Sequence, residues 1–324
     1  MNTSSRWGLA LVGTWFLTAF PLVTQAVVFA NSGDPAKNTT APTGNLTDSG
    51  WQYLGIFDGV IGTPISPHQF IEAKHVGGNV GDSFVFNGVT YTTTSVATTG
   101  NNDLAIWTVS GTLPYYAPLY TGSQEGLYDM VFFGRGASRG AEFRLPGATD
   151  ADNLRGWLWN TSQSGVTRWG TNVFAGVFTP SAAIGQTLYS FLDRSGGADI
   201  ATVASGDSGG PAFINVGGTW QLAGITYAVE SPFRTNSTST QDFNAAVFDV
   251  GGLYTAGSPN NNLIVADQST DVPSFWLSSR LSANSQWIYS TIPESSTWVA
   301  IAFAGFITGG VGWRRFLKAA RSDK

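Results

Sequence analysis

A short glycine-rich segment in the second half of the chain carries the residue types that acyl transfer needs. The segment reads Gly-Asp-Ser-Gly-Gly-Pro at positions 206–211. Its glycines allow a tight turn that exposes the hydroxyl of Ser208, and such a turn leaves backbone N–H groups free to hold an oxyanion. A glycine-rich turn without any chemistry is the alternative, because Gly, Ser and Asp are common in turns. Ser208 is therefore a candidate nucleophile that still needs a base.

The base has few candidates, because the chain contains only two histidines. His75 ends the apolar segment 70–75, where an expected strand would hold the imidazole rigidly. His68 follows a proline in an expected exposed turn. A lone histidine at a strand end is often structural. However, His75 precedes Ser208, which excludes the chain order of α/β-hydrolases, and no strong Asp candidate precedes either histidine, which excludes the chain order of subtilisins. His75 is therefore the candidate base.

A carboxylate is expected to orient the imidazole. Asp103 opens the apolar segment 103–107, which would bury the carboxylate beside His75. An ordinary turn carboxylate is the alternative for Asp103. Three other carboxylates between His75 and Ser208 are not followed by such an apolar segment, namely Asp82, Asp129 and Asp193. The residues thus predict a Ser-His-Asp arrangement.

These segments resemble the chymotrypsin-like (trypsin-like) serine proteases. Residues 206–211 are similar to the family's nucleophile loop, residues 73–76 to its Ala-Ala-His-Cys, and residues 101–107 to its Asn-Asp-Ile-Ala-Leu. Lys74 and Val76 depart from the second motif, and Val76 stands where the family has a cysteine, in a chain that has none. The resemblance implies a triad of His75, Asp103 and Ser208, and an oxyanion hole formed by the N–H groups of Gly206 and Ser208.

The resemblance also implies a substrate pocket formed by Thr202, Tyr227, Ala228 and Val229. Thr202 at its floor, where trypsins have an aspartate, argues against cutting after Arg or Lys. Val229 replaces a glycine and narrows the entrance, which predicts small or medium apolar side chains at the cut site. Tyr227 stands where the family has a serine that supports the triad aspartate.

The aspartate of the nucleophile loop has a further implied role. In activated family members, the residue equivalent to Asp207 pairs with a newly cut N-terminal ammonium. Signal cleavage after Ala26 would expose Val27-Val28, which is similar to the Ile-Val start of the family. This leads to the hypothesis that export itself supplies the activating N-terminus.

The elements that position these residues are expected to be strands. Forty glycines, 11% charged residues and no long amphipathic helical pattern favour an all-β body. The resemblance implies two packed antiparallel six-stranded β-barrels over residues 51–291, with 132–136 opening the second barrel and a short helix over 279–288. Four aromatic residues are predicted to lie in the core, with a substrate-facing loop as the alternative: Trp157, Trp159, Trp169 and Phe174.

The N-terminus is typical of a secretory signal. Arg6 precedes an apolar segment, 7–23, and small residues follow. Cleavage after Ala26 is the first expectation and after Ala30 the second, and a retained membrane anchor is the alternative. Residues 27–50, rich in Asn, Thr, Gly and Pro, are expected to be a linker or pro-segment.

The C-terminus, residues 292–324, resembles a PEP-CTERM sorting signal. Pro293-Glu294-Ser295 precedes an apolar segment, 297–313, and five basic residues follow. Ser295 replaces the second proline of that motif. The resemblance implies a transmembrane helix, at least transient anchoring in the inner membrane, and processing by an exosortase. An ordinary C-terminal anchor is the alternative.

Charge and composition limit the function classes. Residues 27–313 hold 10 Lys and Arg against 20 Asp and Glu, a net charge of about −10, which argues against nucleic-acid binding. We expect no cofactor and no metal. The resemblance implies a serine endopeptidase exported to the cell envelope, the cell surface or the medium, with protein or peptide substrates and a signal peptidase as processing partner. The alternatives are a surface-displayed binding protein with little or no catalysis, and an esterase using the same residues.

Overall fold

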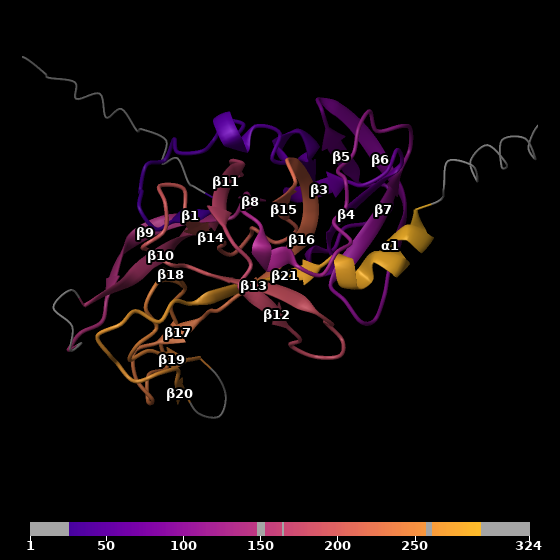
Figure 1. Ribbon diagram of the computed structural model, residues 1–324. Coiled ribbons are helices and arrows are strands. Elements are labelled where there is room, and N and C mark those ends of the chain that lie inside the picture. The colour runs from indigo at the N-terminus through magenta and orange to yellow at the C-terminus, as the bar shows by residue number, and fades with distance from the viewer. Residues whose placement is uncertain (1–25, 148–152, 164, 257–260, 293–324) are drawn as a thin grey trace, which may run out of the picture.

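The computed structural model describes residues 26–147, 153–163, 165–256 and 261–292. Over these ranges the regular structure is mostly β, with one short α-helix and five 3₁₀ turns. Two large β units lie side by side, with smaller sheets at the end far from α1 (Figure 1). The described part of the chain contains no helix with the length and apolar character needed to cross a bilayer. The predicted signal segment, up to residue 25, and the predicted membrane helix, 297–313, lie outside the described residues.

The first unit is a closed antiparallel barrel in the strand order β2-β3-β4-β7-β6-β5. Aromatic side chains fill its interior: the rings of Phe70 and Phe84 stack with centroids 3.9 Å apart. Gly62 is required there, because a Cβ at this position would lie 2.6 Å from the Phe70 ring. The strands are β2 (Gly55–Phe57), β3 (Val60–Pro64), β4 (Gln69–Ala73), β5 (Ser83–Phe86), β6 (Val89–Thr98) and β7 (Leu104–Val109).

One carboxyl group is buried in the wall of this barrel. Glu72 is fully buried, and its Oε1 accepts a hydrogen bond of 2.6 Å from Nε1 of Trp107. Its Oε2 has no hydrogen-bond partner among the described residues. Burial raises the pKa of Glu72 to about 8, although the hydrogen bond from Trp107 acts in the opposite direction. The folded protein therefore holds this carboxyl largely protonated at neutral pH.

Glu72→Gln is expected to stabilise the protein in alkaline solution. The pKa of Glu72 is about 8 in the folded protein against 4.5 for an unperturbed glutamate, so its contribution to stability is complete below pH 4.5 and is lost as the pH rises through 8. Between pH 4.5 and pH 8, this group lowers the free energy of unfolding by roughly 1.4 kcal/mol per pH unit. Urea unfolding of both proteins at pH 5 and pH 8.5 measures the effect, with exposed Glu142→Gln as control. Equal pH dependence in the wild type and Glu72→Gln would refute it.

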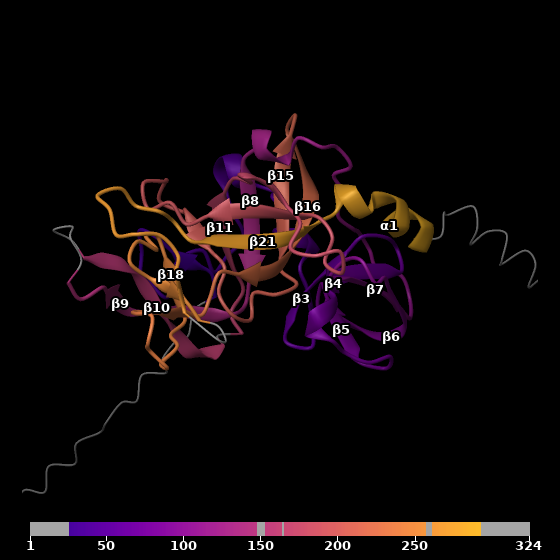
Figure 2. The same ribbon diagram turned by 90° about the horizontal axis from the view of Figure 1, so that it is seen from below.

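The second unit is a seven-stranded antiparallel sheet in the order β11-β8-β15-β16-β21-β13-β12. The resemblance predicted a second closed barrel of six strands here. The strand pairing instead gives an open sheet, because its two end strands, β11 and β12, do not pair with each other. β21 pairs with β16 on one side and with β13 on the other, and Figure 2 shows it crossing the view of this sheet. The strands are β8 (Met130–Gly134), β11 (Arg168–Asn172), β12 (Gly176–Phe178), β13 (Thr187–Phe191), β15 (Pro211–Val216), β16 (Thr219–Val229) and β21 (Phe275–Arg280).

Three smaller sheets complete the described fold. Arg155 is fully buried and pairs with Asp267 at 2.7 Å and Asp249 at 3.3 Å, so this residue of β10 holds the segment between β16 and β21 in place. Removing a partner from such a buried pair is costly. The sheets comprise β1 (Val28–Phe29) with β14 (Ala201–Thr202); β9 (Ala137–Arg144), β10 (Leu154–Gln163) and β18 (Ala245–Val247); and β17 (Phe233–Arg234), β19 (Tyr254–Thr255) and β20 (Asn262–Leu263).

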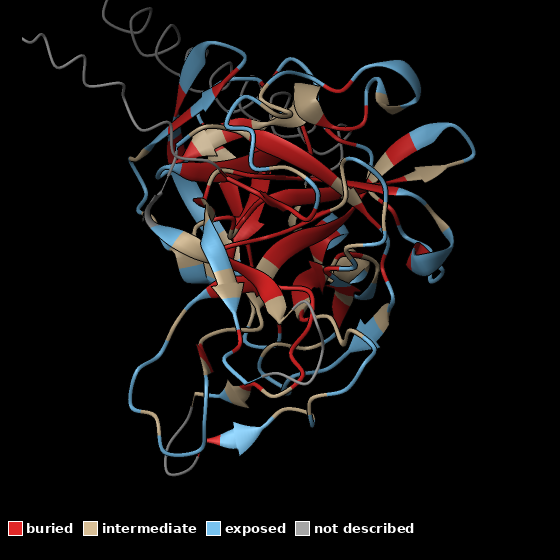
Figure 3. Ribbon diagram, turned by 90° about the vertical axis from the view of Figure 1, so that its left-hand side faces the viewer, coloured by how far each residue is buried: buried red, intermediate tan, exposed pale blue. Residues whose placement is uncertain are grey.

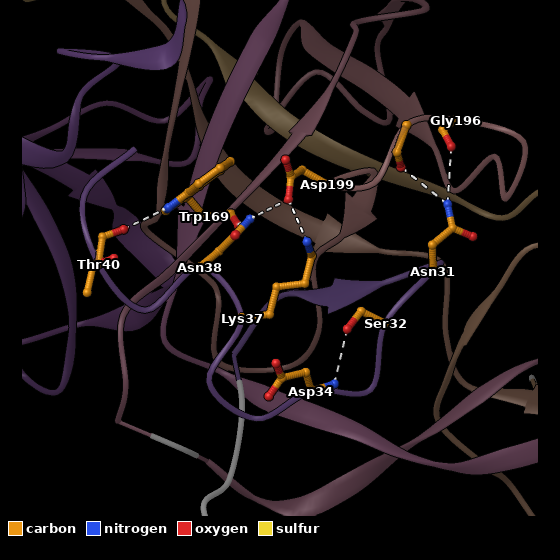
Figure 4. Close-up of polar contacts among 10 residues, drawn as sticks. Asn31, Ser32, Asp34, Lys37, Asn38, Thr40, Trp169, Gly196 and Asp199 are labelled. Carbon is orange, nitrogen blue, oxygen red and sulfur yellow. Dashed lines mark hydrogen bonds and ion pairs between the residues drawn. The ribbon is translucent and has the colours of Figure 1, made fainter. Parts of the chain in front are cut away.

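The segment predicted as a linker or pro-segment packs along the second unit. Lys37 and Asp199 form an ion pair of 2.7 Å, Asn38 donates to the carbonyl of Trp169 at 3.0 Å, and Nε1 of Trp169 donates to the carbonyl of Thr40 at 2.8 Å (Figure 4). Its 3₁₀ turn η1 (Gly44–Leu46) precedes η2 (Trp51–Tyr53). Its polar side chains therefore make specific contacts with the folded body.

The two units share a buried core at their junction, and buried residues occupy the centre of the view in Figure 3. Ile71 and Leu104 of the barrel belong to one cluster with Phe133 and Phe213 of the sheet. Ile288 of α1 (Ser285–Thr291) joins that cluster, after the 3₁₀ turn η5 (Ser282–Asn284). The expected helix over 279–288 therefore begins later, because β21 occupies the first part of that range. Trp157, Trp169 and Phe174 are buried and Trp159 is partly buried, as predicted for core residues.

Candidate functional site

The structure brings Ser208, His75 and Asp103 into hydrogen-bond contact. His75 lies in the 3₁₀ turn η3 (Lys74–Val76) directly after β4, and Asp103 immediately precedes β7. Because β4 and β7 pair with Ala73 opposite Leu104, the two side chains emerge at the same end of the barrel. Ser208 comes from the turn between β14 and β15. The site therefore lies where the barrel meets the seven-stranded sheet.

The distances fix the roles that the imidazole can take. Nδ1 of His75 lies 2.6 Å from Oδ2 of Asp103, and Nε2 lies 2.8 Å from Oγ of Ser208. A carboxylate only accepts hydrogen bonds, so Nδ1 carries the proton and Nε2 is left to accept one from the serine hydroxyl. The His75 side chain is 39% exposed. The geometry is that of a serine activated by an oriented base that solvent and substrate can reach.

Asp103 is held more firmly than the sequence motif indicates. Its side chain is almost fully buried, and Oδ1 accepts the backbone N–H of His75 at 3.0 Å. Nζ of Lys74 donates to the carbonyls of Asn102 at 2.6 Å and Thr99 at 2.9 Å, which closes the loop before β7. From the sequence, Lys74 is only a departure from a family motif. Its contacts across the loop could not be read from its place in the chain.

The nucleophile turn leaves two N–H groups free beside Ser208. Gly206 and Gly209 both have positive φ, +89° and +82°, which favours glycine at these positions. The N–H groups of Asp207, Gly209 and Gly210 bond to backbone carbonyls. Within the described residues, no hydrogen bond engages the N–H groups of Gly206 or Ser208. These are the two donors predicted for the oxyanion hole.

Glycines allow β8 and the segment after it to approach this turn closely. A Cβ at Gly134 would lie 2.1 Å from Oδ1 of Asp207, and one at Gly136 would lie 2.5 Å from the backbone N of Asp207. A Cβ at Gly210 would lie 2.0 Å from the carbonyl oxygen of Phe133. Side chains at these positions would push the turn away from β8. This is a physical reason for the glycines of segment 132–136.

The carboxylate of Asp207 anchors the nucleophile turn through hydrogen bonds from backbone N–H groups. Its carboxylate is buried and accepts the backbone N–H groups of Gly136 at 2.7 Å and Ala204 at 2.8 Å. Burial raises the pKa of Asp207 to about 6, while backbone hydrogen bonds, including one from Val27, lower it. Val27 is itself buried, and the next residue, Val28, pairs with Thr202 across β1 and β14. The predicted mature N-terminus thus lies against the carboxylate.

The four predicted pocket residues differ in accessibility. Thr202 is buried in the pairing with β1, whereas Tyr227, Ala228 and Val229 are half-buried at the end of β16. A register shift between Thr226 and Ala228 leaves Tyr227 outside the ladder with β21, and such a bulge redirects a side chain. The Tyr227 ring lies edge-on to His75, with centroids 5.8 Å apart. Burial, followed by the negative charge of Asp103, raises the pKa of Tyr227.

The second histidine is placed elsewhere. His68, expected in an exposed turn, is half-buried, and its Nδ1 donates to the carbonyl of Gly111 at 2.6 Å. His68 precedes β4 and His75 follows it, so the length of that strand separates the two imidazoles. Comparison of the sequence with protein-family models and with curated proteins found no match. The candidate site therefore rests on the geometry of its own residues.

Proposed function

We propose that this chain is an exported serine endopeptidase of the chymotrypsin-like type. The observation that carries the proposal is the chain of contacts from Asp103 through His75 to Ser208, at 2.6 and 2.8 Å, next to two N–H groups that no other described residue engages. The antiparallel seven-stranded sheet takes the place of the second barrel of that family. Small or medium apolar side chains at the cut site remain the expected preference.

In the proposed mechanism, Oγ of Ser208 attacks the scissile carbonyl while Nε2 of His75 takes its proton. Asp103 keeps the proton on Nδ1 and stabilises the imidazolium that forms. The N–H groups of Gly206 and Ser208 stabilise the oxyanion, a contribution of about 10²–10³ in kcat per donor. His75 then protonates the leaving amine, and water hydrolyses the acyl-enzyme by the same proton transfers in reverse.

Labelling with a fluorophosphonate tests the proposal. The purified exported protein is incubated with the probe, and the adduct is located by mass spectrometry. We expect a single adduct on Ser208, none in Ser208→Ala, and full labelling in Ser205→Ala, which removes a neighbouring exposed hydroxyl. Absence of labelling in the wild type, or equal labelling of Ser208→Ala, would sink the proposal and favour a binding protein on the same scaffold. Cleavage of esters but not of peptides would favour an esterase.

The position of Val27 leads to a prediction about activation. The activity of a protein that begins at Val27 should be at least about tenfold that of a protein that retains Ala26. The reason is that the new N-terminal ammonium would make a hydrogen bond between charged groups, which is worth about 1.5–3 kcal/mol. The new ammonium would pair with the buried Asp207 carboxylate and lower its pKa. Initial rates on one peptide substrate measure this, and Asp207→Asn should abolish the difference. Equal activity of the two forms of the wild-type protein would contradict the prediction.

Cellular placement is part of the proposal. A signal peptidase would release the N-terminus, and residues 292–324 would anchor the protein at least transiently in the inner membrane until an exosortase removed them. The low charge content and the net negative charge of residues 27–313 suit a protein that acts in the cell envelope, at the surface or outside the cell.

A further inference from the structure

A polar pocket lies between the segment that was predicted as a linker and the hairpin formed by β15 and β16. Its walls come from residues 45–53, from Pro118 and from residues 215–220. Its volume is about 430 Å³, which falls in the range of small-molecule sites, roughly 300–1,000 Å³. The pocket therefore exists because the N-terminal segment is folded against the second unit.

Close packing brings the N-terminal segment onto one face of the hairpin. Gly50 has a φ of +123°, and a Cβ at this position would overlap the ring of Phe213. The Tyr53 ring stacks on the same phenylalanine, with centroids 5.9 Å apart. Asn215 pairs with Trp220 across the hairpin, and alternate residues of a strand share a face. Tyr53, Asn215 and Trp220 therefore meet at one pocket.

The pocket is separate from the candidate active site. β15 begins at Pro211, close to Ser208, and Asn215 lies four residues further along it, which is about 13 Å at the usual rise of a strand. On the third side, the carbonyl of Pro118 accepts the N–H of Leu222 at 2.8 Å and holds the connecting segment beside β16. A ligand in this pocket would therefore leave the triad accessible.

The polar side chains of the pocket have hydrogen-bonding groups to spare. Within the described residues, no hydrogen bond engages the side chains of Asn45, Asp48 or Thr219. Nε2 of Gln52 donates to the carbonyl of Asp48 at 3.0 Å, so its Oε1 is left to accept. Oδ1 of Asn215 accepts a backbone N–H of the hairpin turn at 2.9 Å, so its Nδ2 is left to donate. The pocket thus offers donors and acceptors of the amide, hydroxyl and carboxylate types.

These groups suit an uncharged ligand that is rich in hydroxyl groups. Each hydroxyl of a sugar both donates and accepts, and the amides of Asn45, Gln52 and Asn215 can do the same, while the carboxylate of Asp48 accepts. The half-buried ring of Tyr53 gives an apolar surface for the C–H groups of a sugar ring. Among the described residues that line the pocket there is no Lys or Arg, which argues against a phosphate or an acidic sugar.

We propose that this pocket binds a neutral oligosaccharide or a segment of a neutral polysaccharide. The polar side chains hold the hydroxyl groups, and the aromatic wall contacts the apolar face of a sugar unit. The inference goes beyond the proposed endopeptidase function and does not depend on it. It gives the N-terminal segment a role in binding, because three of the polar groups come from residues 45–52.

Affinity electrophoresis of the purified exported protein tests the proposal. Native gels each contain one neutral polysaccharide, namely starch, a β-1,3-glucan, hydroxyethyl cellulose, xylan or galactomannan, and a further gel contains the acidic polygalacturonate. We expect at least one neutral polysaccharide to retard the protein and polygalacturonate to have no effect. Retardation at several polysaccharide concentrations gives Kd. Ser208→Ala should be retarded as the wild type is, because the pocket is separate from the nucleophile.

Two exposed substitutions in the pocket then locate the binding. Asn45→Ala and Asp48→Asn should each raise Kd at least about fivefold, because each removes a group that would bond to a sugar hydroxyl. Asp58→Asn is the matched control, since Asp48 and Asp58 are both exposed and both have positive φ, 60° and 46°. It should leave Kd unchanged. Urea unfolding of all three variants verifies that they fold as the wild type does.

Three outcomes would overturn the inference. The first is that none of the neutral polysaccharides retards the wild type. The second is that one does, but Asn45→Ala and Asp48→Asn are retarded as strongly, which would place the binding elsewhere on the protein. The third is retardation by polygalacturonate alone, which contradicts the argument from charge. All three leave the proposed endopeptidase function untouched, because labelling of Ser208 tests that function separately.

Discussion

Replacing Ser208 or His75 by alanine should lower kcat for peptide hydrolysis by about 10⁶, and replacing both should cost no more than either change alone. The reason is the contact of 2.8 Å between Oγ of Ser208 and Nε2 of His75. Without the imidazole the hydroxyl keeps its proton, and without the hydroxyl the imidazole has nothing to activate. The residues act as one unit, so their effects are not additive.

Residual activity should survive in all three proteins. The N–H groups at positions 206 and 208 remain after these substitutions, and oxyanion stabilisation together with substrate binding still gives about 10³–10⁴ over water. Steady-state rates at high enzyme concentration measure this remainder. His68→Ala removes the other histidine, at the opposite end of β4, and should keep full activity. A double variant much slower than either single variant would show that Ser208 and His75 act independently, contrary to the geometry.

Much of the candidate site could be predicted because its parts are local in sequence. The turn at 206–211 needs its glycines at fixed positions, and the apolar residues that follow Asp103 predict that its side chain is buried. Two histidines leave little choice of base. These signals depend on a few neighbouring residues, so they remain visible without knowledge of the fold. The contacts of Lys74 with Thr99 and Asn102, and that of Asp207 with Gly136, could not be predicted, because these partners are distant in the chain.

The fold of the second unit was harder to predict, because it depends on contacts between residues that are distant in the chain. Whether the second unit closes depends on pairing between strands far apart in sequence, and the structure has an open sheet of seven strands there. Residues 27–50 are predicted to be a linker or pro-segment because they are polar and lack periodicity. However, Lys37, Asn38 and Trp169 satisfy polar groups across more than a hundred residues. Polar composition predicts exposure only where no distant partner exists.

Asp103→Asn should lower kcat by about 10⁴ while leaving the fold intact. In the wild type, Oδ1 accepts the backbone N–H of His75 at 3.0 Å and Oδ2 accepts from Nδ1 at 2.6 Å. An asparagine has one oxygen and one NH₂ group for these two positions. If its oxygen stays on the backbone N–H, the NH₂ group faces Nδ1, which must then accept. The imidazole proton moves to Nε2, and Nε2 can no longer take the proton of Ser208.

The opposite orientation of the amide does not rescue the site, because its NH₂ group would then face the backbone N–H of His75, donor against donor. The prediction is measured as kcat at pH 8, with urea unfolding to verify that stability is retained. Exposed Asp129→Asn is the matched control and should keep the wild-type rate. A loss of less than tenfold in Asp103→Asn would mean that this carboxylate does not set the tautomer of His75. The productive tautomer, which leaves Nε2 able to accept the serine proton, would then be maintained without the carboxylate.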